Sequence, residues 1–545
     1  MKKVKFLIFL IFFPHFFAQA AFTETEKLSG FCKIWGFLKY YHPAVANGKL
    51  DWDAQFIMLL PKVEAAQNAG VLSEIYLQWI DGLGKIPVCQ NCATNKSTFD
   101  KNFSLEWINN RHLFSDALSN KLQFIAANRH QGKKHYVKTA TYGNILMTNE
   151  IDYAFFEFPY KNYRLLSLSR YWNVVEYFFP YKYMSDQNWD SVLAEMLPRF
   201  LNAQNATEYQ LALTETTIKM DDGHASLYPE TVRAYFGKKY IPAYFNIIEN
   251  KAVITGFTNR KLAEANGLQL GDILESTRQT TVSQKMADTE KYVSGSNRSA
   301  KAKNHVFLIF NGETDSVAVT INRDGKTFTK SIGRYTSAAM KEEKPAETEK
   351  HKILDNNISY VNMELLDESD VNAMMETFKN TKAMVVDLRN YPKFIPYAIA
   401  RRLISKNTEY LKTIAPDLSF PGKFYWQENA RIKPLANQYY PGKVIILVNE
   451  KTQSRAEYSA MMLQAGDHSV TVGSQTAGAD GNVSRISYIG FESYMSGTGI
   501  FYPDGTPTQR SGIKIDIQIK PTIEGIKNQK DEVLQRAIDF INFGK

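Results

Sequence analysis

The chain has 545 residues, of which 44% are hydrophobic and 22% charged, and its formal net charge is +9. This composition excludes a disordered, collagen-like or coiled-coil chain, and the length predicts several domains rather than one core. Because basic and acidic residues are interspersed, we expect no nucleic-acid partner.

Residues 1–20 are predicted to be a signal peptide. Three lysines precede an apolar run over residues 6–17, and an Ala-Gln-Ala tripeptide at 18–20 offers a cleavage site before Ala21. The run is too short to span a bilayer, and no other segment approaches the length of a membrane span. The mature protein is therefore expected to be exported, periplasmic or extracellular, without stable membrane insertion. The alternative is a buried N-terminal helix.

The three cysteines are Cys32, Cys89 and Cys92. In an oxidising compartment Cys89 and Cys92 can close a short disulfide; otherwise they are inert thiols. A zinc site would need two further ligands at matching spacing, and none is evident. No metal or cofactor is expected.

A repeat occupies the first half of the chain. The segment KIWGFLKYYHP matches RYWNVVEYFFP at an offset of 137 residues, and a Trp-Asp pair and a Leu-Pro pair follow at the same offset. Each copy is typical of an aromatic helix stopped by proline, then a loop and a second helix. We predict two helical modules, at residues 21–150 and 151–235, whose aromatic residues form packing core. The matched tryptophans are Trp35 with Trp172 and Trp52 with Trp189.

His224 follows an Asp-Gly turn at the end of the second copy, where a helix gives way to a strand. A lone histidine in such a place is interpreted as a structural turn residue, with catalysis as the alternative.

Residues 236–340 change to short alternating strands. In the stretch LAEANGLQLGDILES a short helix ends at Gly267, and a Gly-Asp turn leads into the next strand. This stretch resembles the bacterial PDZ domain, which implies binding of an extended peptide by β-augmentation, although other small β domains use similar turns. The candidate substrate-binding residues are Gly267, Leu268, Gly271 and Asp272.

A charged run at residues 341–352 predicts a linker, and residues 353–545 then alternate between strand and helix. The predicted fold is therefore a multi-domain α/β protein, with helical modules, a small PDZ-like β domain and a βα-alternating C-terminal domain. The expected strands are ISYVNM, AMVVDLR, KVIILVNE and SVTVGS, and the expected helices include PYAIARRLIS, AEYSAMMLQAG and KDEVLQRAIDFI.

Ser454 stands between a buried strand and a helix. A hydroxyl at a helix N-terminus lies beside free backbone N–H groups that can support an oxyanion. The alternative is that Ser454-x-x-Glu457 is only a capping box. The arrangement of Ser454, Glu457 and Gln464, with the strand VVDLRN at 385–390, resembles the tail-specific (C-terminal-processing) serine peptidase family over roughly residues 205–540.

The resemblance implies a serine-type endopeptidase that cleaves exported or envelope proteins presented by the PDZ-like domain. Two departures stand out. Ala479 occupies the place of the family's general-base lysine, and the TAGA turn looks more like the tricorn-type and retinoid-binding-protein-like branches. The tricorn branch uses His and Glu partners, but the strand where that His is expected reads Tyr360-Val-Asn362, and Gln509 stands where the Glu is expected. Glycines that usually follow DLRN are also replaced, and Pro392 has no N–H to donate. An oxyanion donor would then be Tyr391, Lys393 or the amide after Ser454.

The general base is left open by the sequence. Lys393 is a candidate because burial can lower the pKa of a lysine, Asp480 is another, and His468 is expected to be exposed. The candidate catalytic residues are Ser454, Lys393 and Asp480, and the expected partner is a protein or peptide substrate. The alternatives are a catalytically inactive peptide-binding or scaffolding relative, and a carbohydrate or lipid hydrolase, for which the chain lacks a G-x-S-x-G elbow.

Overall fold

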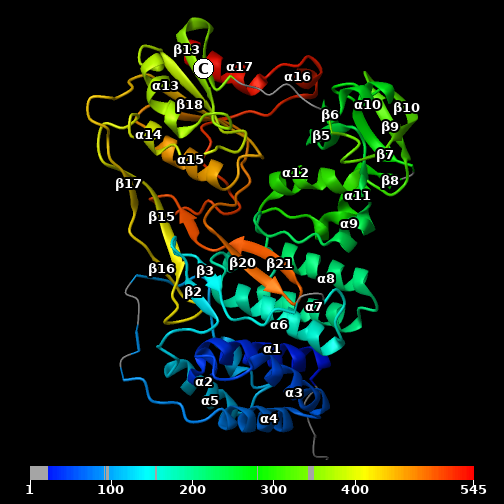
Figure 1. Cartoon of the computed structure of the whole chain (residues 1–545), viewed down its shortest axis with the longest axis vertical. Helices are drawn as coiled ribbons and strands as arrows, with labels where there is room; N and C mark the ends of the chain where they lie inside the picture. The colour runs from blue at the N-terminus through cyan, green and yellow to red at the C-terminus, as the bar shows by residue number, and fades with distance from the viewer. Residues whose placement is uncertain are drawn as a thin grey trace, which may run out of the picture.

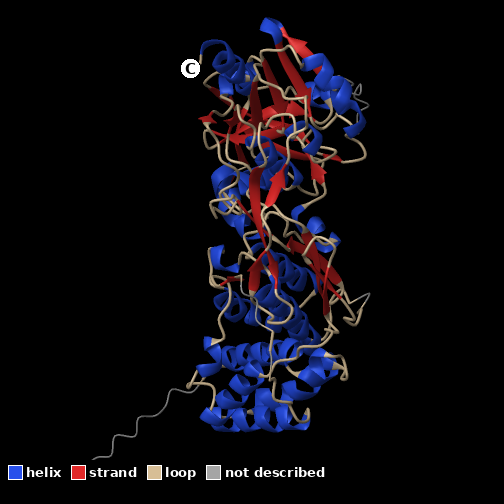
Figure 2. Ribbon diagram, turned by 90° about the vertical axis from the view of Figure 1, so that its left-hand side faces the viewer, coloured by secondary structure: helices blue, strands red, loops and turns tan. Residues whose placement is uncertain are grey.

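The computed structural model describes residues 22–90, 92–93, 97–153, 156–278, 280–341 and 349–544. The molecule is elongated, with helices at one end and the larger sheets toward the other (Figures 1 and 2). The predicted signal peptide lies outside the described residues. Within the described ranges, no helix is both long enough and apolar enough to cross a membrane.

The helical end is built from one three-helix unit that occurs twice. Each helix of the second copy begins 137 residues after its counterpart, which is the offset of the sequence repeat. The pairs are α1 (Glu24–Tyr41) with α6 (Lys161–Phe178), α3 (Trp52–Ala65) with α7 (Trp189–Asn202), and α4 (Ala69–Gly82) with α8 (Ala206–Ile218). The remaining elements here are α2 (Pro43–Ala46), α5 (Asp116–Ala127), α9 (Glu230–Phe236), β1 (Thr98–Phe99), β2 (Val137–Thr139) and β3 (Ile145–Met147).

A reciprocal pair of tryptophan hydrogen bonds fixes the first two helices of each copy. The indole N–H of Trp35 donates to the carbonyl of Trp52 at 3.0 Å, and that of Trp52 donates to the carbonyl of Trp35 at 3.0 Å. Trp172 and Trp189 repeat both bonds at 2.8 and 3.0 Å. All four side chains are buried, and the two copies share one hydrophobic core. A buried indole needs such an acceptor, so these residues are scaffold rather than ligand platform.

The third helix of each copy begins at the same tetrapeptide, Ala-Gln-Asn-Ala. The side chain of Asn68 accepts the N–H of Val71, and that of Asn205 accepts the N–H of Glu208. Both asparagines are therefore helix N-caps. The sequence analysis did not extend the repeat to this helix.

Residues 236–340, which the sequence predicts to be PDZ-like, contain a sheet in the order β10-β9-β7-β6-β5. As the sequence predicts, a helix ends before Gly267 and β7 begins at Ile273; Gly267 and Gly271 have the positive φ angles that favour glycine. The elements are β4 (Lys239–Tyr240), β5 (Ala243–Ile248), β6 (Lys251–Phe257), α10 (Arg260–Ala265), β7 (Ile273–Thr277), β8 (Thr280–Thr281), α11 (Val282–Thr289), α12 (Arg298–Ile309), β9 (Ser316–Arg323), β10 (Lys326–Gly333) and β11 (Tyr335–Thr336).

The C-terminal region contains a sheet in the order β12-β13-β14-β18-β19-β23, in which every neighbouring pair is parallel except β12 with β13. Alternate residues of β14 pack on opposite faces. Ala383 and Val385 contact the core under α17, whereas Met384 and Val386 contact the core under α13 and α15. A strand buried on both faces is continuously apolar, which is why the sequence identified it. The parallel strands end at one edge of the sheet, where the candidate site lies.

The elements of this sheet and its helices are β12 (His351–Leu354), β13 (Ile358–Asn362), α13 (Val371–Phe378), β14 (Ala383–Asp387), β18 (Lys443–Val448), α15 (Arg455–Gln464), β19 (Ser469–Gly473), β23 (Ile517–Gln518), α16 (Ile523–Lys527) and α17 (Glu532–Phe543). The predicted helix PYAIARRLIS is wrong in extent, because α14 covers only Tyr397–Ala400. The Arg402 guanidinium bonds back to the carbonyl of Ala398 at 2.6 Å, and the chain turns away.

Antiparallel strands that the sequence analysis missed connect this sheet to the helical end. They are β15 (Thr408–Pro416), β16 (Phe424–Trp426), β17 (Ala430–Ile432), β20 (Val483–Tyr488), β21 (Phe491–Ser496) and β22 (Gly499–Phe501). The β20–β21 hairpin lies beside α6 and α8 in Figure 1, and the ring of Tyr488 stacks on Tyr171 with centroids 3.9 Å apart. This contact brings the turn after α8 next to the end of β21.

Candidate active site

Ser454 has an unusual backbone conformation. It lies between β18 and α15 with φ 56° and ψ −120°. Side-chain-bearing residues rarely adopt positive φ, and such strain gathers at functional sites. An ordinary helix N-cap has extended backbone angles. The turn instead resembles the strained strand-to-helix elbow that exposes a nucleophilic serine in other hydrolases.

Glu457 ties this elbow to the turn that follows β19. Its fully buried carboxylate accepts the N–H groups of Gly478 at 2.8 Å, Ala479 at 3.0 Å and Ser454 at 3.3 Å. Burial raises the pKa of Glu457, and these bonds oppose that shift. The Ser454 N–H also donates to the carbonyl of Ala479 at 2.9 Å. Glu457, which the sequence predicted as part of a capping box, thus joins the elbow before α15 to the turn after β19.

Ala479 faces Gly223, which belongs to the turn after α8. A Cβ added to Gly223 would lie 2.9 Å from the Cβ of Ala479. The place of the family's lysine is therefore filled by another part of the chain. A hydrogen bond of 3.1 Å from Gln453 Nε2 to the Gly223 carbonyl holds the two turns together.

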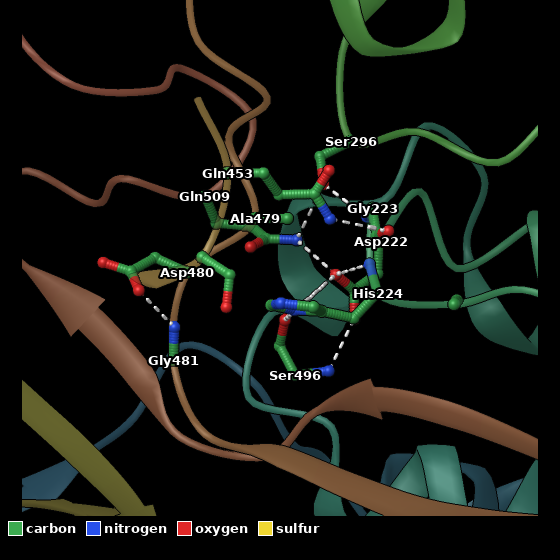
Figure 3. A network of polar contacts seen from close by, with 12 residues as sticks. Asp222, Gly223, His224, Ser296, Gln453, Ala479, Asp480, Gly481, Ser496 and Gln509 are labelled. Atoms are coloured by element: carbon green, nitrogen blue, oxygen red, sulfur yellow. Dashed lines mark hydrogen bonds and ion pairs between the residues drawn. The ribbon is translucent and has the colours of Figure 1, made fainter. Parts of the chain in front are cut away.

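His224 is the residue that this turn brings to the site. Its imidazole is 9% exposed, and Nδ1 lies 2.8 Å from the hydroxyl of Ser496 (Figure 3). Nε2 is buried and has no hydrogen-bond partner among the described residues. Burial lowers the pKa of His224, while the charge of Asp222 partly opposes that shift. A neutral imidazole with an open nitrogen is suited to accept a proton.

The sequence analysis interpreted His224 as a structural turn residue, so it gave this histidine too little weight. The repeat held a usable signal. At the offset of 137 residues the first copy has Pro87 where the second has His224, so the two copies diverge at this turn. The contact with Ser496 had no local sequence signal, because 272 residues separate the two.

The structure does not bring Lys393 to Ser454 as a base. The Lys393 side chain is 48% exposed, and its ammonium bonds Asp367 at 2.9 Å and the carbonyl of Leu365 at 3.1 Å. His468 is exposed and precedes β19, whereas Ser454 follows β18, so the two lie at opposite ends of the sheet.

Asp480 is buried beside the site but turned away from His224 (Figure 3). One of its oxygens accepts the N–H of Gly481 at 2.7 Å, and the other has no partner among the described residues. Burial and the nearby charge of Glu457 raise the pKa of Asp480 well above its ordinary value. Its orientation does not favour Asp480 as the partner of His224.

Three backbone N–H groups are candidate donors to an oxyanion: those of Tyr391 and Lys393 in the loop after β14, and that of Arg455. The N–H of Lys393 is engaged with the carbonyl of Met363 at 3.3 Å. In the described part of the chain, the N–H groups of Tyr391 and Arg455 have no acceptor. The Arg455 guanidinium bonds the carbonyl of Lys393 at 2.9 Å, so it fixes this loop against the start of α15. Tyr391 and Arg455 are thus the available donors.

An open hollow of about 480 Å³ lies beside the elbow, and its lining includes the charged residues Glu368, Lys393 and Arg455. Tyr458 and Met462 contribute from α15, four and eight residues after Ser454 and hence on the same helix face. The loop residues Phe394, Ile395 and Tyr397 complete its apolar lining. Arg455, the residue after Ser454, also lines the hollow, which therefore adjoins the start of α15.

The four residues predicted to bind substrate in the PDZ-like region have packing roles. Leu268 belongs to its hydrophobic core, and buried Asp272 forms a bidentate ion pair with Arg323 at 2.6 and 2.7 Å. Gly267 and Gly271 shape the turn. The groove of this region, about 620 Å³, instead lies between edge strand β5 and helix α12, and none of the four residues lines it.

A serine at a strained elbow, at the end of a parallel sheet and joined to a histidine-bearing turn, is the arrangement expected of a serine hydrolase. Residues 357–524 match the family model described as peptidase family S41, and this match supports a serine peptidase. No curated protein sequence matches the chain.

Solved structures resemble the chain at low sequence identity. Mature CPAF complexed with lactacystin has a TM-score of 0.55 and 13% identity, covering 70% of this chain and 99% of that one. A putative peptidase from Parabacteroides merdae has a TM-score of 0.45 and 15% identity, covering 70% and 97%. The photosystem II D1 C-terminal processing protease has 0.39 and 16%, covering 68% and 97%. The likeness to CPAF shows that the fold is shared.

Proposed function

We propose that this protein is a serine endopeptidase in which Ser454 is the nucleophile and His224 is the general base. The observation that carries the proposal is the strained backbone of Ser454 at the end of β18, joined through Gln453 and Gly223 to the turn that bears His224. Strain of this kind is retained where the surrounding structure over-determines it, and here Glu457 and Ala479 hold the serine amide.

Ser454 and His224 have different roles in the proposed reaction. His224 Nε2 takes the proton of the Ser454 hydroxyl as Oγ forms a bond with the substrate carbonyl carbon. The amides of Tyr391 and Arg455 stabilise the oxyanion that results. The protonated imidazole then returns its proton to the leaving amine as the peptide C–N bond breaks. Water hydrolyses the acyl-enzyme by the same steps.

Exported or envelope proteins are the proposed substrates. The predicted signal peptide supports export, and Cys89 and Cys92 form a disulfide, which suits an oxidising compartment. The groove between β5 and α12 supports presentation of an extended segment, because β5 is an edge strand able to pair with one.

The test is hydrolysis of unfolded protein substrates by the wild type, Ser454→Ala and Ser459→Ala. Ser459 is a matched control: it is a buried serine on the same helix, and its hydroxyl has no partner in the described part of the chain. Ser454→Ala should abolish cleavage and cost about 1 kcal/mol of stability or less, and Ser459→Ala should keep its rate. Equal turnover by wild type and Ser454→Ala would exclude the nucleophile. Binding without turnover by the wild type would favour the scaffolding alternative.

A further inference from the structure

The hydrogen bonds around His224 determine which nitrogen carries its proton. The Ser496 hydroxyl lies 2.9 Å from Asp222 Oδ1 and 2.8 Å from His224 Nδ1. An ionised carboxylate only accepts, so the single proton of the hydroxyl goes to Asp222. The Ser496 oxygen must then accept from Nδ1–H. This assigns the proton to Nδ1 and leaves the lone pair on Nε2, the nitrogen that a base would use.

Asp222 is held in place to receive that hydroxyl. It is 1% exposed, and its Oδ2 accepts the backbone N–H of the same Ser496 at 2.6 Å. Its Oδ1 also accepts the backbone N–H of His224 at 3.2 Å. The carboxylate itself is 3.8 Å from Nδ1, which is too far for a direct hydrogen bond. The Ser496 hydroxyl therefore links the Asp222 carboxylate to the His224 imidazole.

Gln509 occupies the position at which the family resemblance predicts a glutamate. Gln509 is buried, and its Nε2 lies 3.4 Å from Asp222 Oδ1 and 3.4 Å from the Ser296 hydroxyl. A neutral amide cannot stabilise an imidazolium as a charge does. Gln509 donates to the carboxylate and so supports Asp222 instead of replacing it.

We propose that Asp222 and Ser496 position His224 through a hydroxyl-bridged relay, in which Ser496 stands between the imidazole and the carboxylate. The proposal rests on the proposed function. When Nε2 receives the Ser454 proton, the Nδ1–H bond to Ser496 stays in place and the Asp222 charge stabilises the imidazolium. No proton leaves Nδ1, so the bridge orients and stabilises without being consumed. Ser496 and Asp222 are positioning residues.

Other charges near His224 are engaged elsewhere or turned away from the imidazole. Asp480 points away from the imidazole and Glu457 is bonded within the 476–479 turn. Asp221, next in the chain to Asp222, pairs with Lys301 at 2.8 Å and lies 3.6 Å from Arg510. In the described part of the chain, Asp222 is thus the carboxylate whose removal should change the basicity of His224.

The chain supplies matched controls for both positions. Ser493 is a fully buried serine on β21, like Ser496, but its hydroxyl bonds the carbonyl of Ser226 at 3.3 Å. Asp221 is a buried carboxylate beside Asp222 that does not bond the imidazole or Ser496. Ser493→Ala and Asp221→Asn therefore remove equivalent groups without touching the relay.

The experiment measures kcat, KM and the pH profile of kcat/KM for Ser496→Ala, Asp222→Asn and both controls, after thermal melts show that each is folded. We expect both relay variants to lower kcat by about 100-fold or more, with little change in KM. The acid limb of the profile should move to lower pH in both: Asp222→Asn removes the charge that favours the imidazolium, and Ser496→Ala removes the acceptor of its Nδ1–H. The controls should keep the position of the limb and a kcat within about threefold of wild type.

Ser496→Ala decides the question if Asp222→Asn does not fold. A wild-type kcat and an unmoved acid limb in folded Ser496→Ala would overturn the relay. A loss of kcat that Ser493→Ala matches would also overturn it, since the effect would then be one of packing. Ser454→Ala and His224→Ala are assayed alongside: if these are inactive while Ser496→Ala is fully active, the relay alone fails, and if they remain active, the proposed function fails.

Discussion

The two copies of the three-helix unit have the same scaffold and different uses. Their helices begin at equivalent residues, and each copy has the same reciprocal tryptophan bonds and the same asparagine cap. They differ in what lies against the third helix. In α8 every residue from Tyr209 to Ile218 is buried, whereas α4 buries only a stripe. The β20–β21 hairpin packs on the second copy, and the turn after α8 carries the histidine of the site.

This difference shows that the candidate site depends on where a copy of the unit lies in the fold more than on the helical unit itself. After α4 the chain runs through Pro87 to the Cys89–Cys92 disulfide. After α8 it turns through Asp222 and Gly223 to His224, which meets β21. One unit therefore supports the molecule, and its duplicate supports the molecule and also bears the histidine that we propose as the general base.

The largest expected effect separates the two turns directly. His224→Ala removes the general base and should lower kcat/KM by roughly 100- to 10,000-fold. Pro87→Ala changes the equivalent position of the first copy and should leave kcat/KM within about twofold of wild type, because Pro87 is an exposed surface residue. Steady-state kinetics on one unfolded protein substrate measures both. Comparable losses in the two variants would show that His224 matters only for folding.

The pH dependence of the wild type should come from the second copy. A base must be neutral to accept a proton, so kcat/KM should fall about tenfold per pH unit below the pKa of His224. Burial lowers that pKa, which places the acid limb below the ordinary histidine value of about 6.5. A pH–rate profile measures it. An acid limb well above that value would contradict a buried, neutral histidine as the base.

A smaller effect tests whether the two scaffolds are equivalent. Trp35→Phe and Trp172→Phe each remove one buried indole donor to a tryptophan carbonyl, which keeps its helical hydrogen bond in α3 or α7. Each should lower the free energy of unfolding by about 1.5 kcal/mol, the upper end of the net contribution of one hydrogen bond. Denaturant unfolding compares the two variants. A loss confined to one copy would break the structural equivalence.

The smallest effect concerns the caps of the third helices. Asn68→Ala and Asn205→Ala each remove the acceptor of one helix N-terminal N–H and should cost about 1 kcal/mol. Thermal melts of the two variants measure this. A far larger loss for Asn205→Ala, accompanied by loss of activity, would mean that α8 is held mainly by its start and not by its buried faces.

The sequence correctly predicted the features that depend on local residue patterns. Continuous apolar runs identified the strands around Val385 and Ile445, and the Gly-Asp turn at Gly271 placed the start of β7. Ser454 was singled out by its strand-to-helix junction. The base was not found, because its partner Ser496 lies on a hairpin whose place against α6 depends on the stacking of Tyr488 on Tyr171. Lys393 has the right chemistry, but its ammonium is engaged by Asp367 at the surface.

The most direct measurement is covalent labelling of the folded protein with a fluorophosphonate, followed by mass spectrometry of its tryptic peptides. The account predicts one modified residue, Ser454, with labelling reduced about 100-fold or more in His224→Ala and unchanged in Pro87→Ala. Modification at another serine, or equal labelling of Ser454 with and without His224, would contradict the assignment of this pair as nucleophile and base.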